Sequence, residues 1–131
     1  MSIREKHLRA YIKGWRSMDI DAVLSSLTDD FVFHDQVLVA PVKADRMADF
    51  MRDWKTQIEG LSNGWDYEDS DEVIKDQDGV LLRWKWWQFL GTNIQGSAVT
   101  KTTDVGMVYE LLPGLFNTAS DRCACSVLTV S

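Results

Sequence analysis

The aspartate at position 35 is the first residue whose type and place predict chemistry. It ends the run D-D-F-V-F-H-D at 29–35, whose alternation places Phe31, Phe33 and Asp35 on one face of a short strand. Burial on an apolar face disfavours the charged form of a carboxylate and raises its pKa, as a general base working near neutral pH requires. Asp35 is therefore a candidate base. The alternative is that it only ends the strand and caps a turn.

Two further polar residues fall on faces that are otherwise apolar or small. Tyr11 lies on the apolar stripe of an expected helix, either as an ordinary core tyrosine or as a hydrogen-bond donor in a pocket. Asp104 alternates with Thr102, Gly106 and Val108, whose small side chains would leave room for a ligand. One carboxylate that removes a proton next to a carbonyl, with two neutral acids that stabilise the oxyanion, would suffice for enolisation.

The elements that must position these residues follow from the hydrophobic periodicity. Apolar residues at three- and four-residue steps predict helices at 4–17, about 20–28 and about 44–59, and Asp19 is a good N-cap for the second. A strand at 31–35 lies between the second and third helices. From residue 65 the period changes to two, which predicts further strands; these are expected at 65–75, 80–90 and 98–112, with a last one between 115 and 130.

This order predicts an α+β domain. About three N-terminal helices would pack into a curved antiparallel sheet that forms a cone, and such a cone leaves a natural ligand cavity. Its expected apolar wall consists of aromatic residues from the helices, the first strand and the strand at 80–90: Trp15, Phe33, Phe50, Trp54, Trp84 and Trp86. Arg83 and Lys85 would then lie on the outer face with their charged heads in water.

Bulk composition narrows the partners and the compartment. The 131 residues fit one domain over 1–131, and the net charge of -6 argues against nucleic acid and anionic membranes as partners. No apolar run is long enough for a membrane span and no secretory signal is present, so we expect a cytoplasmic protein. The two histidines and the pair Cys123 and Cys125 show no metal-ligand spacing, and the cysteines are expected to be small buried side chains.

Four motifs carry a resemblance to a known family. They are Y-I-K-G-W-R-S-M-D-I-D-A-V-L-S-S-L-T-D-D-F-V-F-H-D at 11–35, W-x-W at 84–86, G-T-N-I-Q-G at 91–96 and T-T-D-V-G-M-V at 102–108. From residue 4 to about 110 the chain resembles the nuclear transport factor 2-like superfamily, in particular its SnoaL-like polyketide cyclase and ketosteroid isomerase branches. That fold hosts isomerases, cyclases, dehydratases, hydrolases and non-catalytic binding modules, so the resemblance alone does not fix an activity.

The resemblance implies roles for three residues. In the ketosteroid isomerase pattern, Tyr11 matches the oxyanion-hole tyrosine, Asp35 the general base and Asp104 the second, protonated aspartate. In SnoaL-like cyclases the acid/base aspartate lies on the late strand, where Asp104 is again the matching position. The resemblance also implies a homodimer, for which Trp87, Phe89 and Tyr109 could supply an apolar patch.

Two functions remain open from the sequence. The first is a cofactor-independent isomerase, cyclase or dehydratase that acts on a small hydrophobic carbonyl compound by proton transfer and uses no metal. The second is a non-catalytic domain of the same fold that binds a small apolar molecule or mediates dimerisation, in which tryptophan side chains could fill the cavity.

Overall fold

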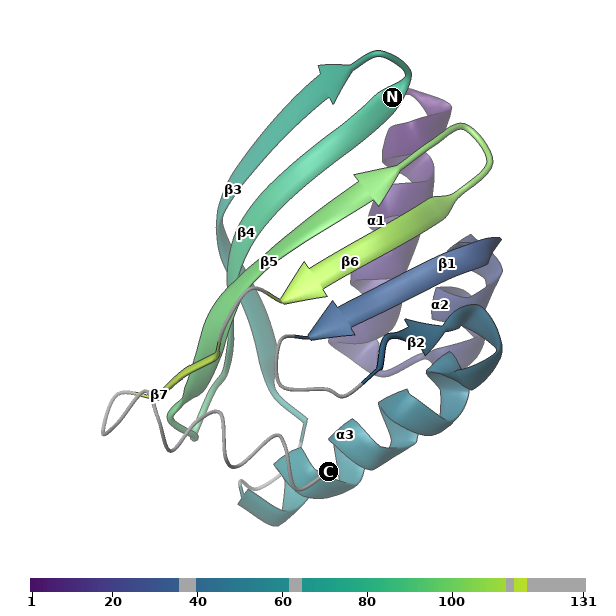
Figure 1. Cartoon of the computed structure of the whole chain (residues 1–131). Coiled ribbons are helices and arrows are strands. Elements are labelled where there is room, and N and C mark those ends of the chain that lie inside the picture. Colours follow the sequence, from purple (N-terminus) through teal and green to yellow (C-terminus); the bar gives the residue numbers. More distant parts are fainter. Residues whose placement is uncertain (36–39, 62–64, 113–114, 118–131) are drawn as a thin grey trace.

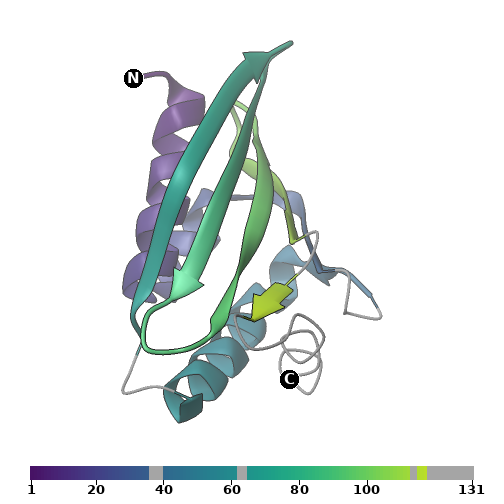
Figure 2. The same cartoon turned by 90° about the vertical axis from the view of Figure 1, so that its left-hand side faces the viewer.

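The computed structural model describes residues 1–35, 40–61, 65–112 and 115–117. Within these ranges, three α-helices lie on the concave side of one curved sheet (Figures 1 and 2). The helices are α1 (Ile3–Ser17), α2 (Ile20–Ser26) and α3 (Met47–Leu61), and a short 3-10 helix, η1 (Ala44–Arg46), leads into α3. The strands are β1 (Leu27–Asp35), β2 (Val42–Lys43), β3 (Tyr67–Gln77), β4 (Val80–Phe89), β5 (Ile94–Thr102), β6 (Met107–Leu112) and β7 (Leu115–Asn117).

The sheet has the strand order β2-β1-β6-β5-β4-β3, with β7 paired to β5. The predicted α+β cone is confirmed, with one refinement: the neighbouring strands β1 and β6 are parallel, whereas the other paired strands are antiparallel. The parallel pair sets Phe33 opposite Glu110 and Asp35 opposite Leu112. The C-terminal ends of β1 and β6 therefore lie side by side in the sheet.

Local capping explains where the first two helices begin and end. The Ser2 side chain accepts a hydrogen bond from the Glu5 amide at the start of α1. At its end, Met18 adopts the left-handed conformation with φ 51°. Asp19 then accepts from the Ala22 amide and caps α2, as the sequence predicts. This tight connection holds α1 and α2 together beneath the sheet.

The prediction of one long strand at 98–112 is wrong. The backbone groups of Thr103 and Gly106 bond each other and close a turn between β5 and β6, and Gly106 has φ 152°. Asp104 lies in this turn with 67 % of its side chain exposed, 3.1 Å from the Arg4 guanidinium. It therefore cannot project from the inner face of a strand.

The two faces of β4 are the reverse of those predicted. Trp84 is 38 % exposed and Trp86 half-buried on the outer side, whereas Arg83 and Lys85 are 3 % and 4 % exposed and point into the cone. Trp87 and Phe89 share the inner face, so they cannot supply an outer patch for a dimer. The reason is that Asp69 and Glu72 of β3 pair with the two cations, and Glu110 of β6 is buried where the charge of Lys85 acts on it.

Some sequence expectations fall outside the described residues, among them Cys123, Cys125 and most of the predicted last strand. Across the described ranges, no helix is both long and apolar enough to cross a membrane. In the same part of the chain, no group of three or more His, Cys, Asp or Glu side chains is arranged to hold a metal ion.

The close approach at Gly106 gives a test of the fold. A Cβ atom there would lie 2.6 Å from the backbone oxygen of Ser26, so Gly106→Ala should lower the free energy of unfolding by about 1–3 kcal/mol, measured by urea denaturation. Gly60→Ala is the matched control, because a Cβ there meets nothing within 4 Å, and it should be neutral or slightly stabilising. Equal effects of the two substitutions would contradict the described turn.

Candidate active site

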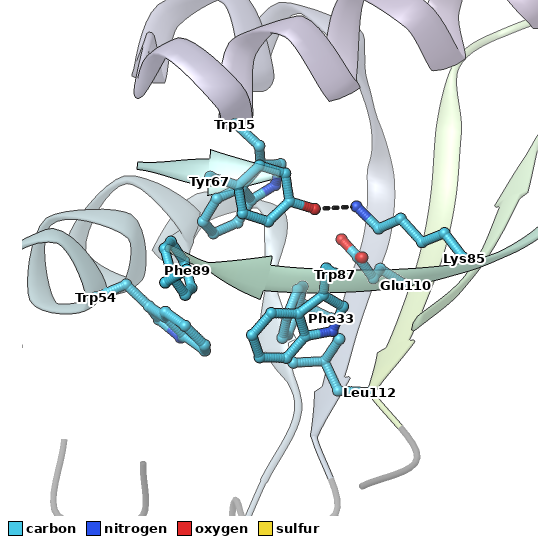
Figure 3. Close-up of a pocket in the computed structure, with 9 residues that line it drawn as sticks. All are labelled: Trp15, Phe33, Trp54, Tyr67, Lys85, Trp87, Phe89, Glu110 and Leu112. Atoms are coloured by element: carbon cyan, nitrogen blue, oxygen red, sulfur yellow. Dashed lines mark hydrogen bonds between the residues drawn. The ribbon is translucent and has the colours of Figure 1, made fainter. Parts of the chain in front are cut away.

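An aromatic cavity lies inside the cone, between the sheet and the helices (Figure 3). Its apolar wall consists of Trp15, Phe33, Trp54, Trp87, Phe89 and Leu112, and its polar residues are Tyr67, Lys85 and Glu110. The space open to the centres of water-sized molecules is about 30 Å³, enough for little more than water. Three polar side chains therefore converge on a small, mostly apolar space, which is the usual composition of a ligand site.

Glu110 is the carboxylic acid of this cavity. It lies on β6, is 4 % exposed, and accepts a hydrogen bond from the Tyr11 hydroxyl of α1. Burial raises the pKa of Glu110 above its ordinary value, although Lys85 and the Tyr11 hydrogen bond act in the opposite direction. The pKa of Tyr11 is raised well above its usual value by its own burial and by Glu110, so Tyr11 stays protonated and donates.

Lys85 supplies the positive charge. Its Nζ donates to the Tyr67 hydroxyl and lies 3.0 Å from Asp69 Oδ1, and Figure 3 shows it beside the Glu110 carboxylate. Burial alone would raise the pKa of Asp69, but Lys85, the Tyr67 hydrogen bond and Arg83 hold it below its ordinary value. Asp69 is therefore ionised, and it fixes the ammonium group of Lys85 at the edge of the cavity.

A second layer of charges surrounds Asp69. Arg83 Nη2 lies 3.4 Å from Asp69 Oδ2, and Arg83 Nε donates to Glu72. Arg9 of α1 holds Glu72 with two hydrogen bonds of 2.8 and 2.9 Å. The bonds from Arg9, and then those from Arg83, lower the pKa of Glu72 to about 2. These pairs balance the charges that β4 places inside the cone.

An irregularity in β3 allows both Asp69 and Glu72 to reach Arg83. The register against β4 shifts between Ser70 and Val73, and Asp71 adopts the left-handed conformation with φ 55°. A regular strand would send Asp69 and Glu72 to opposite faces, because they are three residues apart. The bulge turns Glu72 to the same side as Asp69, where both meet Arg83.

The three residues of the predicted triad do not come together. Asp35 is buried, 5 % exposed, on the face it shares with Phe31 and Phe33, but it does not line the described cavity. Tyr11 bonds Glu110 instead of facing a ligand directly. Asp104 lies in the surface turn before β6, whereas Asp35 pairs with Leu112 at the other end of that strand.

The aromatic residues predicted for the pocket divide into three groups. Trp15, Phe33 and Trp54 line the cavity. Phe50 is half-buried behind it, its ring centroid 4.8 Å from that of Phe33. Trp84 and Trp86 belong to the outer face of the sheet, outside the cavity.

Sequence reasoning missed the polar residues Tyr67, Asp69, Lys85 and Glu110. The alternation of side chains along the strands contains a signal for two of them, Lys85 and Glu110. Lys85, like Arg83, is in phase with Leu81 and Trp87, and Glu110 is in phase with Leu112. Charged residues in phase with large apolar ones are expected on the buried face when partners of opposite charge lie there. The alternation alone does not reveal those partners, because they are far away in the sequence.

Comparison with known proteins identifies the fold and the family. No curated protein sequence matches at a significant level. A proposed SnoaL-like polyketide cyclase from Shewanella putrefaciens CN-32 is 13% identical, with TM-score 0.64 and coverage of 100% of this chain and 99% of that one. An LEH-like epoxide hydrolase of M. tuberculosis is 14% identical, with TM-score 0.60 and coverage of 98% and 92%. TerC, co-crystallised with polyporic acid, is 16% identical, with TM-score 0.64 and coverage of 99% and 100%.

At these identities the likeness shows a shared fold. The family model of the SnoaL-like domain matches residues 8–112, and the chain therefore belongs to the SnoaL-like domain family.

Proposed function

We propose that this protein is an enzyme that moves a proton on a small, apolar carbonyl compound, with Glu110 as the acid/base group. The observation that carries this proposal is the placement of a buried carboxyl of raised pKa beside a buried ammonium, on one aromatic cavity. A raised pKa brings a carboxyl closer to the pH at which it can both accept and return a proton. Glu110 thus takes the role that the sequence predicts for Asp35 or Asp104.

The proposed reaction begins with removal of a proton from the carbon next to the carbonyl. The proton passes to the Glu110 carboxylate, the C–H electron pair forms a carbon–carbon double bond, and the carbonyl electron pair moves onto oxygen. Lys85 is the donor for this oxyanion, since its ammonium faces the cavity, and Tyr67 holds that ammonium in place. In a substrate with a carbon–carbon double bond next to the deprotonated carbon, the carbonyl re-forms and Glu110 returns the proton to the far end of that double bond, which isomerises the substrate. Alternatively, the enolate carbon attacks a second carbonyl and closes a ring, and the resulting alkoxide takes the proton from Glu110.

Tyr11 and Asp69 act as positioning residues in this scheme. Tyr11 holds one carboxylate oxygen of Glu110, which leaves the other oxygen for the substrate proton. Asp69 lies at an ion-pair distance of 3.0 Å from the Lys85 ammonium and holds this donor in place. The names of the structural relatives, a polyketide cyclase and an epoxide hydrolase, agree with a fold that handles oxygenated carbon compounds.

A non-catalytic binding domain is the second candidate. The observation that favours it is the small free volume of about 30 Å³, because a ligand larger than water must first displace aromatic side chains. Such a domain would bind small apolar molecules saturably without turning them over.

Hydrogen exchange on carbonyl compounds separates the two candidates. We expect the protein to accelerate deuterium uptake next to the carbonyl of at least one member of a panel of small apolar ketones in D₂O, followed by NMR. Glu110→Gln should reduce that rate by about 10²–10⁴-fold, because the amide cannot accept the proton. Asp104→Asn, a surface change of the same kind, should leave it unaltered. An undiminished rate in Glu110→Gln rules out the proposed base, and saturable binding without exchange supports the binding domain.

The buried pair of Lys85 and Asp69 gives a prediction that is independent of substrate. Lys85→Met should destabilise the fold by less than the about 3–5 kcal/mol typical of a broken buried pair, because Arg83 still faces Asp69. Combined with Asp69→Asn, the loss should be smaller than the sum of the single losses by about 0.5–3 kcal/mol in urea denaturation. The exposed pair Arg52 and Asp49 is the control and should couple by about 0.2–0.5 kcal/mol. Additive losses at Lys85 and Asp69 would show that the two do not form a pair.

A further inference from the structure

We propose that the groove between α1 and β3 binds the anionic group of a small molecule: a phosphate, sulfate or carboxylate. This groove lies outside the aromatic cavity and shares no lining residue with it. Figure 2 shows α1 running beside β3. The groove offers about 740 Å³ to the centres of water-sized molecules, far more than the inner cavity. Its lining residues are Arg9, Ile12, Lys13, Arg16, Ser17, Asp69, Ser70, Asp71, Glu72 and Arg83.

One face of α1 supplies the cations. Arg9, Lys13 and Arg16 follow each other at four- and three-residue steps, which places them on the same side of the helix. With Arg83 they are four positive groups, against the three carboxylates Asp69, Asp71 and Glu72 on the opposite wall. This local excess of positive charge stands out in a chain with a net charge of -6, and it favours an anion.

Two of these cations, Lys13 and Arg16, have hydrogen-bond donors without a partner among the described side chains. Arg9 does not, because both of its terminal nitrogens donate to Glu72. Arg16 is 56% exposed, and its nearest carboxylate oxygen, on Asp69, is 3.9 Å away, beyond hydrogen-bond distance. Lys13 is exposed and forms no ion pair within the described residues. Lys13 and Arg16 are therefore the rim groups that an anion meets first.

The floor of the groove holds an unpartnered donor. Arg83 is 3 % exposed; its Nε donates to Glu72 and its Nη2 to Asp69, but its Nη1 is buried with no hydrogen-bond partner in the described part of the chain. A buried charged donor without an acceptor is costly, and an oxyanion supplies the missing acceptor. The Arg9 and Glu72 side chains, which are 39% and 29% exposed, are the ones that can shift to admit it.

The shapes and charges of the arginine and lysine side chains in the groove indicate which class of anion fits. A planar guanidinium matches the oxygens of phosphate or carboxylate, and the separate charges of Lys13 and Arg16 favour a group that carries more than one negative charge. Asp69 and Glu72 do not oppose such an anion strongly, because each is already paired with at least one cation. Asp71, which is exposed and forms no ion pair among the described residues, is the one lining carboxylate that opposes it. We therefore expect phosphate to bind more tightly than acetate.

Titration of the full chain with inorganic phosphate, at constant ionic strength, tests this site. In proton–nitrogen NMR spectra we expect saturable shifts confined to residues 9–17, 69–72 and 83. The double variant Lys13→Gln with Arg16→Gln should weaken binding at least tenfold. A control variant, Arg52→Gln with Lys55→Gln on α3, removes the same charge from another exposed helix face and should leave the affinity unchanged.

Each result of this titration decides the proposal. Saturation by phosphate alone supports a site for phosphate or sulfate esters, and comparable saturation by acetate supports a site for carboxylates. Shifts that rise linearly without saturation, or an equal loss of affinity in both double variants, would overturn the proposal, because they indicate only a response to net charge. Shifts centred away from α1 and β3 would overturn it as well.

Discussion

Two buried cations on one strand are the constraint on which the rest of this structure depends. The inner face of β4 carries Arg83 and Lys85 into the cone, where an unpaired charge would cost several kcal/mol or more. Asp69 and Glu72 of β3 meet them, and the bulge in β3 is what brings both acids to one side. Helix α1 completes this ion-pair network, because its Arg9 pairs with Glu72.

Glu110 differs from the other acids because its surroundings are mainly apolar. Asp69 and Glu72 each contact at least two cationic side chains, and their pKa values are lowered. Glu110 accepts a hydrogen bond from Tyr11 and lies beside Lys85, yet its burial among aromatic rings still raises its pKa. The same network therefore contains ion pairs that hold a donor in place and one carboxyl that can exchange a proton. This division of roles is what general acid/base chemistry requires.

Local patterns in the sequence were sufficient for the helices, the caps and the fold class, since these depend on periodicity and neighbouring residues. They also placed Trp15, Phe33 and Trp54 where the cavity lies. They failed at β4, because its two faces both carry large aromatic residues and the choice is made by acids on other strands. The patterns also placed Asp104 wrongly on the inner face of a strand, because the alternation at 98–112 predicts one continuous strand, whereas a turn closed by Gly106 interrupts it.

The measurement that tests the central claim most directly is an NMR titration of the Glu110 carboxyl carbon, assigned with Glu110→Gln. Because burial raises the pKa of Glu110, its proton should leave at a pH above the ordinary glutamate value of 4.5, and the Lys85 and Tyr11 side-chain signals should respond in the same pH range. The free energy of unfolding should fall as the pH rises from 4.5 through that midpoint, since the folded state disfavours the charged form. A midpoint at or below 4.5 would contradict the account, because Glu110 would then be one more charged partner in the ion-pair network.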